Sequence, residues 1–255
     1  MNEQKKNIAI STKDISKTYI SGTEVFTAIK NVTLDLYEGD FTVIMGASGS
    51  GKSTLLYCLS GLDNLTLGSV YIKDRQIDRL TEKESSDLRA KKIGFVYQSI
   101  NLVPDMNIFD NIALPGYITG YRKKSVQERV SNLMEQMGII GLENRFPSQV
   151  SGGQQQRAAI ARAIINSPEI VFADEPTGSL NREYGTAILD ILTEMNKAGQ
   201  TIIMVTHDIR AAARADRMIY FKDGSIAGEL ELGKFRESET LSREKDIFTF
   251  ISESE

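Results

Sequence analysis

The sequence has a single cysteine, Cys58, so no disulfide can form within the chain. It has no apolar run that approaches the roughly 20 residues needed to span a bilayer as a helix. Its first residues are not followed by the apolar segment that a secretory signal peptide requires. These absences predict a protein of the reducing cytoplasm. Any role at a membrane is therefore expected to come through a partner.

The chain also lacks the excess of positive charge that marks nucleic-acid-binding domains. Its 255 residues include 30 Lys and Arg against 34 Asp and Glu, a formal net charge of −4 at pH 7. We therefore expect no nucleic-acid partner. The composition, 41% hydrophobic and 25% charged, is typical of a globular protein, and no internal repeat is present. A single globular domain is the expectation that the motifs below refine.

A glycine-rich segment matches the Walker A pattern of phosphate-binding loops. It follows a short apolar strand predicted at residues 43–45 and precedes leucines at helical spacing. Glycines let successive backbone N–H groups turn toward phosphates, while the helix that follows presents its positive end. The predicted nucleotide-binding residues are Gly46, Ala47, Ser48, Gly49, Ser50, Gly51, Lys52, Ser53 and Thr54.

Two residues of this loop have specific expected roles. Lys52 should contact the β- and γ-phosphates, and the Ser53 hydroxyl should ligate magnesium. The phosphate loop leads us to expect ATP as a cofactor. Because the sequence has no Cys/His cluster for zinc or iron, Mg²⁺ is the one metal that we expect with it. The alternative for an isolated match is a glycine-rich turn that binds no nucleotide.

Two adjacent carboxylates follow an apolar strand predicted at residues 170–173. Asp174 should emerge at the carboxyl end of that strand, where open α/β sheets bind ligands, and should hold the magnesium shell. Glu175 is the expected general base for the water that attacks the γ-phosphate. The alternative is a helix N-cap or a solvated acidic pair.

Three further residues are candidates for the same site. His207, the only histidine, follows a predicted strand and is expected to hydrogen-bond the γ-phosphate and the attacking water. Gln98 also follows a predicted strand; its amide is expected to reach magnesium or the water and to couple nucleotide state to the next segment. Tyr19 is a candidate for stacking on adenine. Taken singly, each residue has an alternative: a structural histidine, a surface glutamine and a core tyrosine.

Taken in chain order, these segments resemble the nucleotide-binding subunit of an ATP-binding-cassette transporter: the phosphate loop, Gln98, Ser151, Gly152, Gly153, Gln154, Asp174, Glu175 and His207. The resemblance covers residues from about 8 to 230. Its specific element is Ser-Gly-Gly-Gln at 151–154, which ordinary phosphate-loop ATPases lack. The resemblance implies a homodimer in which each ATP lies between the phosphate loop of one copy and residues 151–154 of the other. It also implies an integral-membrane permease as partner, and hence a place at the cytoplasmic face of the membrane.

Within this superfamily, residues 111–115 and 173–178 resemble the branch that serves macrolide export, lipoprotein release, division signalling and peptide-antibiotic resistance. Asn181 departs from the aspartate that most members carry, and is similar to the bacitracin-type resistance transporters. The leading hypothesis is an ATPase that drives a separate permease in antimicrobial-peptide resistance or export, with a sensor histidine kinase connected through the permease. The alternatives are an ATPase that regulates envelope proteins without moving cargo, and a soluble cassette protein outside transport.

The same patterns predict an α/β fold. Short apolar strands joined by helices predict a parallel sheet, as in a RecA-like phosphate-loop core. Alternation in the first forty residues predicts an antiparallel β subdomain, and helical periodicity predicts an inserted α-helical subdomain at about 99–157. We expect one ATPase domain over residues 1–235. The charged tail, 236–255, is expected to form a solvated helix.

Overall fold

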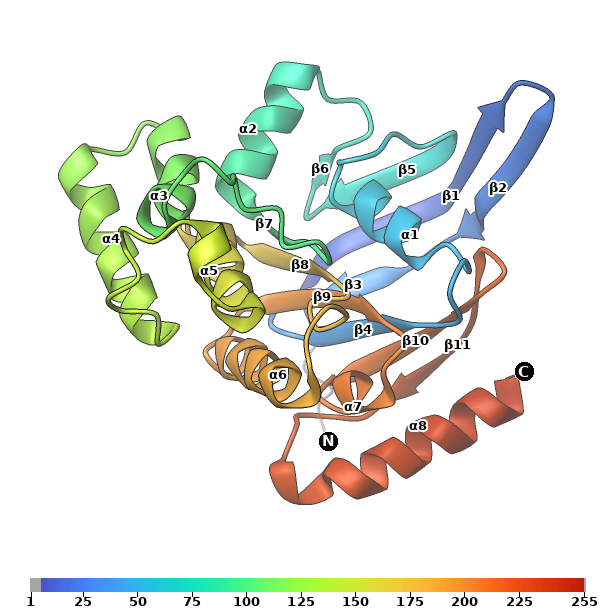
Figure 1. Cartoon of the computed structure of the whole chain (residues 1–255). Helices are drawn as coiled ribbons and strands as arrows, with labels where there is room; N and C mark the ends of the chain where they lie inside the picture. The colour runs from blue at the N-terminus through green and yellow to red at the C-terminus, as the bar shows by residue number, and fades with distance from the viewer. Residues whose placement is uncertain (1–5, 255) are drawn as a thin grey trace. The chain divides into compact units, whose positions relative to one another are not determined.

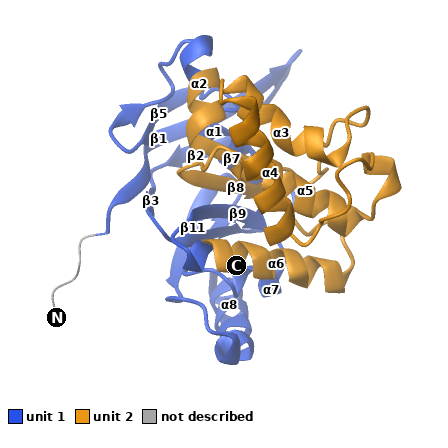
Figure 2. Ribbon diagram, turned by 90° about the vertical axis from the view of Figure 1, so that its left-hand side faces the viewer, with its two compact units in different colours: residues 1–85, 196–255 blue, residues 86–195 orange. Residues whose placement is uncertain are grey.

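The computed structural model describes residues 6–254. The chain divides into two compact units, coloured separately in Figure 2. Unit 1 comprises residues 1–85 and 196–255, and unit 2 comprises residues 86–195. Unit 2 is therefore inserted between two segments of unit 1.

Unit 1 contains the antiparallel sheet predicted for the N-terminal segment. Its strands are β1 (Ile8–Ser21), β2 (Glu24–Val32), β3 (Asp35–Tyr37), β5 (Leu67–Ile72) and β6 (Arg75–Gln76). The long β1 pairs with β2, β3 and β5, and β5 pairs with β6. Ile10, Ile15 and Ile29 are fully buried, but burial does not alternate strictly as the sequence suggested, since their neighbours Ala9 and Ala28 are buried as well.

Unit 1 also contains parallel strands. β4 (Phe41–Met45) lies between β9 (Thr201–Thr206) and β10 (Arg217–Lys222) and is parallel to both, while β11 (Ser225–Glu231) returns antiparallel to β10. Every residue of β4 and β9 is buried, as expected for parallel strands. The predicted hairpin is confirmed, since Lys222 pairs with Ser225 around two residues of positive φ, Asp223 and Gly224.

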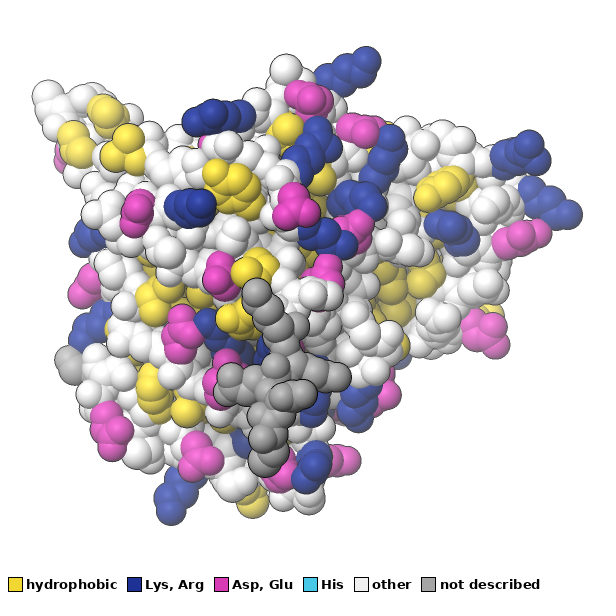
Figure 3. All heavy atoms as spheres, turned by 180° about the vertical axis from the view of Figure 1, so that it is seen from behind, with side chains coloured by type: hydrophobic (Ala, Val, Ile, Leu, Met, Phe, Trp, Pro, Cys, Tyr) yellow, Lys and Arg dark blue, Asp and Glu magenta, His cyan; other side chains and the backbone are white. Residues whose placement is uncertain are grey.

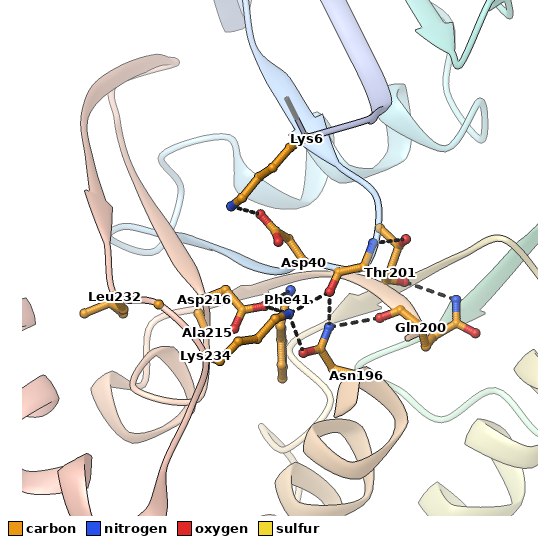
Figure 4. A network of polar contacts seen from close by, with 12 residues as sticks. Lys6, Asp40, Phe41, Asn196, Gln200, Thr201, Ala215, Asp216, Leu232 and Lys234 are labelled. Atoms are coloured by element: carbon orange, nitrogen blue, oxygen red, sulfur yellow. Dashed lines mark hydrogen bonds and ion pairs between the residues drawn. The ribbon is translucent and has the colours of Figure 1, made fainter. Parts of the chain in front are cut away.

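A polar network fastens the amino end of β4 (Figure 4). Asp216 is 3% exposed and accepts hydrogen bonds from the Phe41 N–H at 2.8 Å and from Lys234 Nζ at 2.6 Å. Lys234 also donates to the Gly39 carbonyl at 2.8 Å, and Asn196 donates to the same carbonyl at 3.0 Å. The network joins both chain segments of unit 1 and fixes β4 in register.

The helices of unit 1 are α1 (Lys52–Leu59), α7 (Ile209–Ala212), the 3-10 turn at Glu237–Glu239, and α8 (Thr240–Ser254). α8 lies against α7 and β11 (Figure 1). Arg243 and Ile247 of α8 are buried, at 4% and 0% exposure. The tail is helical, as expected, but it is docked through these two residues and is not a fully solvated helix. The helix is docked because the guanidinium of Arg243 donates hydrogen bonds to five backbone carbonyls, those of Ala213, Ala215, Leu232, Gly233 and Lys234.

Unit 2 holds two parallel strands and most of the helices. β7 (Ile93–Val96) pairs with β8 (Ile170–Asp174), with Val96 opposite Ala173. The helices are α3 (Ile108–Ile118), α4 (Lys123–Gln136), the 3-10 turn at Pro147–Gln149, α5 (Gly152–Ile164) and α6 (Arg182–Lys197), and α2 (Glu82–Lys92) enters from unit 1. α3, α4 and α5 pack on one another (Figure 1) around Ile112, Val130 and Met134.

Among residues 6–254, no helix combines the length and the apolar content that a membrane span requires. On the face drawn in Figure 3, lysine and arginine side chains are interspersed with aspartate, glutamate and apolar side chains. This mixture agrees with the small negative net charge of the whole chain, −4 at pH 7.

Candidate nucleotide-binding site

The phosphate loop of unit 1 joins β4 to α1 and requires glycine at two positions. A Cβ at Gly46 would lie 2.1 Å from the Phe221 carbonyl oxygen, and one at Gly51 would lie 2.3 Å from the Ala28 oxygen. Gly51 also has a φ of 102°, a conformation that other residues rarely adopt. The loop is thus seated directly against the backbone of β2 and β10.

Two side chains of this loop suit a phosphate ligand. Lys52 is 5% exposed, and its Nζ donates to the Ala47 carbonyl at 2.7 Å, so the ammonium folds over the loop. The Ser50 hydroxyl oxygen is buried and has no hydrogen-bond partner. Because buried polar groups in folded proteins are nearly always paired, this hydroxyl has capacity left for a further hydrogen bond. The residues present therefore fit the phosphates of a nucleotide.

His207 lies at the same edge of the parallel strands as the phosphate loop. Thr206, the last residue of β9, pairs with Met45, the last residue of β4, so His207 and Gly46 follow neighbouring strand ends. His207 is exposed, and Asp208 caps α7 directly after it by accepting from the Arg210 N–H at 2.9 Å. The cap fixes the backbone that carries the imidazole.

Tyr19 lies on β1 in the same unit and is 41% exposed. Its hydroxyl donates to Asp63 Oδ2 at 2.7 Å and is also hydrogen-bonded to the side chain of Thr54, the last residue of the phosphate loop. Desolvation, followed by the bond to Asp63, raises the pKa of Tyr19 to about 12. The hydroxyl therefore remains a donor at physiological pH.

Unit 2 brings Gln98 and Glu175 together. Val96 and Ala173 are the last residues that pair between β7 and β8. Gln98 and Glu175 each lie two residues after that pair. Gln98 Nε2 and Glu175 Oε2 lie 3.3 and 3.4 Å from the point where a Cβ on Gly178 would stand. Gly178 therefore leaves room for both side chains, and buried Asp174 ends β8 one residue before Glu175.

Glu175 has a left-handed backbone, with a φ of 42°. A non-glycine residue in this region costs of order 1–3 kcal/mol, and such strain clusters at active sites. The turn that imposes the conformation is closed by the Gly178 N–H, which donates to the Glu175 carbonyl at 3.0 Å. Asp14 and Asp223 share this conformation, with φ values of 47° and 50°, so the positions of Gln98 and Asp174 beside Glu175 carry the assignment.

The segment 151–154 forms the first turn of α5. Ser151 is the N-cap: its hydroxyl accepts from the Gln154 N–H at 3.3 Å, while Gln154 Oε1 accepts from the Ser151 N–H at 2.9 Å. This reciprocal capping box makes the helix begin here. Ser151 and Gly152 are exposed, whereas Gly153 is buried against the Tyr184 side chain.

One residue of unit 2 was not predicted from the sequence. Arg162 of α5 donates to the carbonyls of Ile100 and Asn101, at 3.0 and 2.6 Å. Ile100 and Asn101 have φ values of 62° and 52°, which is unusual for a β-branched residue such as Ile100. Arg162 thus ties α5 to the strained turn that follows Gln98. No signal in the sequence indicates this contact, because neither residue of the turn is glycine.

Each unit therefore gathers its own cluster. Unit 1 brings together the phosphate loop, His207 and Tyr19, and unit 2 brings together Gln98, Asp174 and Glu175. The hydroxyl of Ser53 and the oxygens of Gln98 and Asp174 are hard donors of the kind that Mg²⁺ prefers. Among the described residues, no group of three or more His, Cys, Asp or Glu side chains could hold a metal ion.

Comparison with known proteins identifies the family. Residues 29–178 match the family model described as ABC transporter. The chain belongs to the ABC transporter family. It has the fold of the ABC ATPases and is an ATP-binding, ATP-hydrolysing subunit, as the resemblance in the sequence predicts.

Three relatives show the branch. An uncharacterized ABC transporter ATP-binding protein of Methanocaldococcus jannaschii, MJ0796, is 45% identical over 232 residues, 89% of this chain and 98% of the relative. The bacitracin export ATP-binding protein BceA of Halalkalibacterium halodurans is 40% identical over 225 residues, 88% of this chain and 89% of BceA. The macrolide export ATP-binding/permease protein MacB of Mannheimia succiniciproducens is 41% identical over 87% of this chain, which spans only 34% of MacB.

A solved structure supports the same relationship. The dimeric, post-hydrolysis structure of the MJ0796 cassette, bound to ADP and Pi, superposes with a TM-score of 0.82 and 40% identity, covering 89% of this chain and all of the relative.

Proposed function

We propose that two copies of this chain associate head to tail around two ATP molecules and drive a separate membrane permease. The observation that carries the proposal is the exposed, capped start of α5 at Ser151 and Gly152. A helix N-terminus presents unsatisfied N–H groups and partial positive charge, which suit the γ-phosphate of an ATP held by a second copy. The dimeric ADP-bound structure of the relative MJ0796 supports this arrangement.

ATP binding is assigned to the residues of both clusters. Residues 46–54 would hold the phosphates, with Lys52 on the β- and γ-phosphates, and Tyr19 would stack on the adenine. Mg²⁺ would be held by Ser53, Gln98 and Asp174 and would neutralise developing phosphate charge when bound. The orphaned hydroxyl of Ser50 supports phosphate binding by this loop.

Hydrolysis is assigned to Glu175 as general base. The oxygen of the attacking water bonds to the γ-phosphorus, the bond from that phosphorus to the leaving ADP oxygen breaks, and the water proton passes to the Glu175 carboxylate. The proximity of Gln98 to Glu175 allows the amide to orient the same water. His207 would hydrogen-bond the γ-phosphate and so respond to its presence.

The transported substrate is proposed from the relatives. BceA is named for bacitracin export, which supports a role in antimicrobial-peptide resistance or export, whereas MacB is named for export of macrolides, which are not peptides. Asn181 is compatible with the fold, because its Oδ1 accepts from the Tyr184 N–H at 3.0 Å at the start of α6 and asparagine caps helices as well as aspartate does. The chain would then act at the cytoplasmic face of the membrane, held there by the permease.

The dimer is tested by size-exclusion chromatography of the Glu175→Gln protein, which should bind ATP without hydrolysing it. With Mg²⁺ and ATP it should elute at twice the monomer mass, and ADP should leave it monomeric. The matched variant is Glu175→Gln combined with Ser151→Arg, whose bulky side chain blocks the start of α5. A Glu175→Gln protein that binds ATP yet stays monomeric would contradict ATP-driven association of the isolated subunit, and a dimer that survives Ser151→Arg would contradict the role of residue 151.

A further inference from the structure

The Tyr19 side chain belongs to a charged cluster that no motif predicts. Lys17 Nζ donates to Asp63 Oδ1 and to the Asn64 carbonyl, both at 2.6 Å, and the Tyr19 hydroxyl donates to the other oxygen of Asp63 at 2.7 Å. Both oxygens of one carboxylate are therefore used, one for the ammonium and one for the phenol. Charge-assisted bonds of this kind hold their partners firmly.

Lys17 also covers one face of the aromatic ring. Its Nζ lies 4.8 Å from the centroid of the Tyr19 ring, within the range of a cation–π contact. Lys17 is only 9% exposed, whereas Tyr19 is 41% exposed, so a large part of the tyrosine remains accessible beside a buried ammonium. A cation on one face withdraws electron density from the ring, which favours stacking of an electron-rich base on the other face.

The cluster is connected to the phosphate loop by α1. That helix begins at Lys52 and ends at Leu59. Asp63 lies just beyond its end, and the Asp63 N–H donates to the carbonyl of Tyr57 in the last turn, so the helix fixes the position of Asp63. Thr54 on the first turn of α1 hydrogen-bonds the Tyr19 hydroxyl directly. One short helix thus fixes the lysine proposed for the phosphates and the anchors of the tyrosine ring.

The carboxylate is charged under physiological conditions. Burial acts to raise the pKa of Asp63, but the hydrogen bonds from Lys17 and Tyr19 outweigh burial and the net pKa lies below its usual range. The anchor for the phenol is therefore present throughout the neutral pH range.

We propose that Asp63 and Lys17 are positioning residues for the nucleobase. They hold the Tyr19 ring with one face against the Lys17 ammonium and the other available to the purine of ATP. This inference rests on the proposed function, in which Tyr19 stacks on adenine, and it names the residues that set the ring for that contact.

The test compares a ligand that has a base with one that does not. Isothermal titration calorimetry would measure Mg²⁺–ATP and Mg²⁺–tripolyphosphate binding to the full chain and to Tyr19→Ala, Asp63→Asn and Lys17→Gln. Tyr19→Ala should raise the Kd for ATP about tenfold, in line with the energy of base–aromatic stacking. Asp63→Asn and Lys17→Gln should raise it roughly three- to fivefold, and Lys17→Arg should restore most of the affinity. The Kd for tripolyphosphate should not change in any variant.

Lys13→Gln is the matched control, because Lys13 lies on the same strand and makes a cation–π contact with a different ring, that of Tyr71, at 5.4 Å. This substitution should leave the Kd values for ATP and for tripolyphosphate unchanged. Wild-type ATP affinity in Asp63→Asn and Lys17→Gln, or an equal loss for both ligands, would overturn the inference. Unchanged ATP affinity in Tyr19→Ala would overturn both the inference and the assigned role of Tyr19. The proposed ATP-dependent dimer is tested separately, by the size-exclusion chromatography of Glu175→Gln, so the two proposals can fail independently.

Discussion

Cys58 lies on α1 and is 2% exposed, and burial raises the pKa of its thiol to about 12. Because the thiolate is the reactive form, native protein at pH 8 should react with iodoacetamide on the order of 10³-fold more slowly than the chain unfolded in guanidinium chloride, where the pKa is about 8.5. Since the folded pKa is the higher of the two, the stability that Cys58 contributes is complete below about pH 8.5 and falls as the pH rises toward 12. Mass spectrometry of alkylated protein measures the rate. Equal labelling of native and unfolded chains would contradict the buried thiol.

Residue spacing predicted the candidates whose chemistry depends on type and order, such as Lys52 and Glu175. Cys58 was also predicted as a small buried residue, because it stands beside Leu59 on an apolar helix face. Lys17 and Asp63 escaped prediction because they are far apart in sequence and meet only when β1 lies beside the segment after α1. The assigned catalytic roles remain predictions.

At the scale of an element, Arg243 determines whether α8 is attached. Its buried guanidinium donates to five backbone carbonyls beyond α7 and β11. Arg243→Ala would leave these carbonyls without their donor, so the free energy of unfolding should fall by roughly 2–4 kcal/mol. Urea unfolding measures the change. Lys245→Ala, on the exposed face of α8, should change it by less than about 0.5 kcal/mol. Equal effects of the two substitutions would contradict the anchoring role.

The elements that the sequence predicted well are those whose burial is uniform. β4, β8 and β9 each contain a continuous apolar run and have every residue buried, and each run was expected within the bounds of the observed strand. β5 and α2 were missed. Gly68 and Ser69 interrupt the apolar pattern of β5, and Leu88 is the one buried residue recorded for α2, so no periodicity marks that helix. The docking of α8 could not be predicted, since a charged residue makes the buried contact.

At the scale of the whole molecule, ATP should stabilise the folded chain by mass action. With Mg²⁺–ATP at about 100 times its Kd, the gain is roughly 2.7 kcal/mol, which for a chain of this size raises Tm by about 5–10 °C. Lys52→Ala should abolish this shift, whereas Lys13→Gln should retain it. Differential scanning fluorimetry measures both, and a full shift in Lys52→Ala would contradict the assignment of Lys52 to the phosphates.

The insertion of unit 2 between the two segments of unit 1 determines the order in which strands can pair while the chain is being synthesised. Because Phe41 of β4 pairs with Ile202 of β9, about 160 residues later, and chains grow at roughly 5–20 residues per second, β4 waits on the order of ten seconds for that neighbour. Unit 2 is one contiguous segment and emerges complete within that interval. The parallel strands of unit 1 therefore come together only after unit 2 has emerged, and until then the nascent chain carries the apolar strand β4 without its two neighbours.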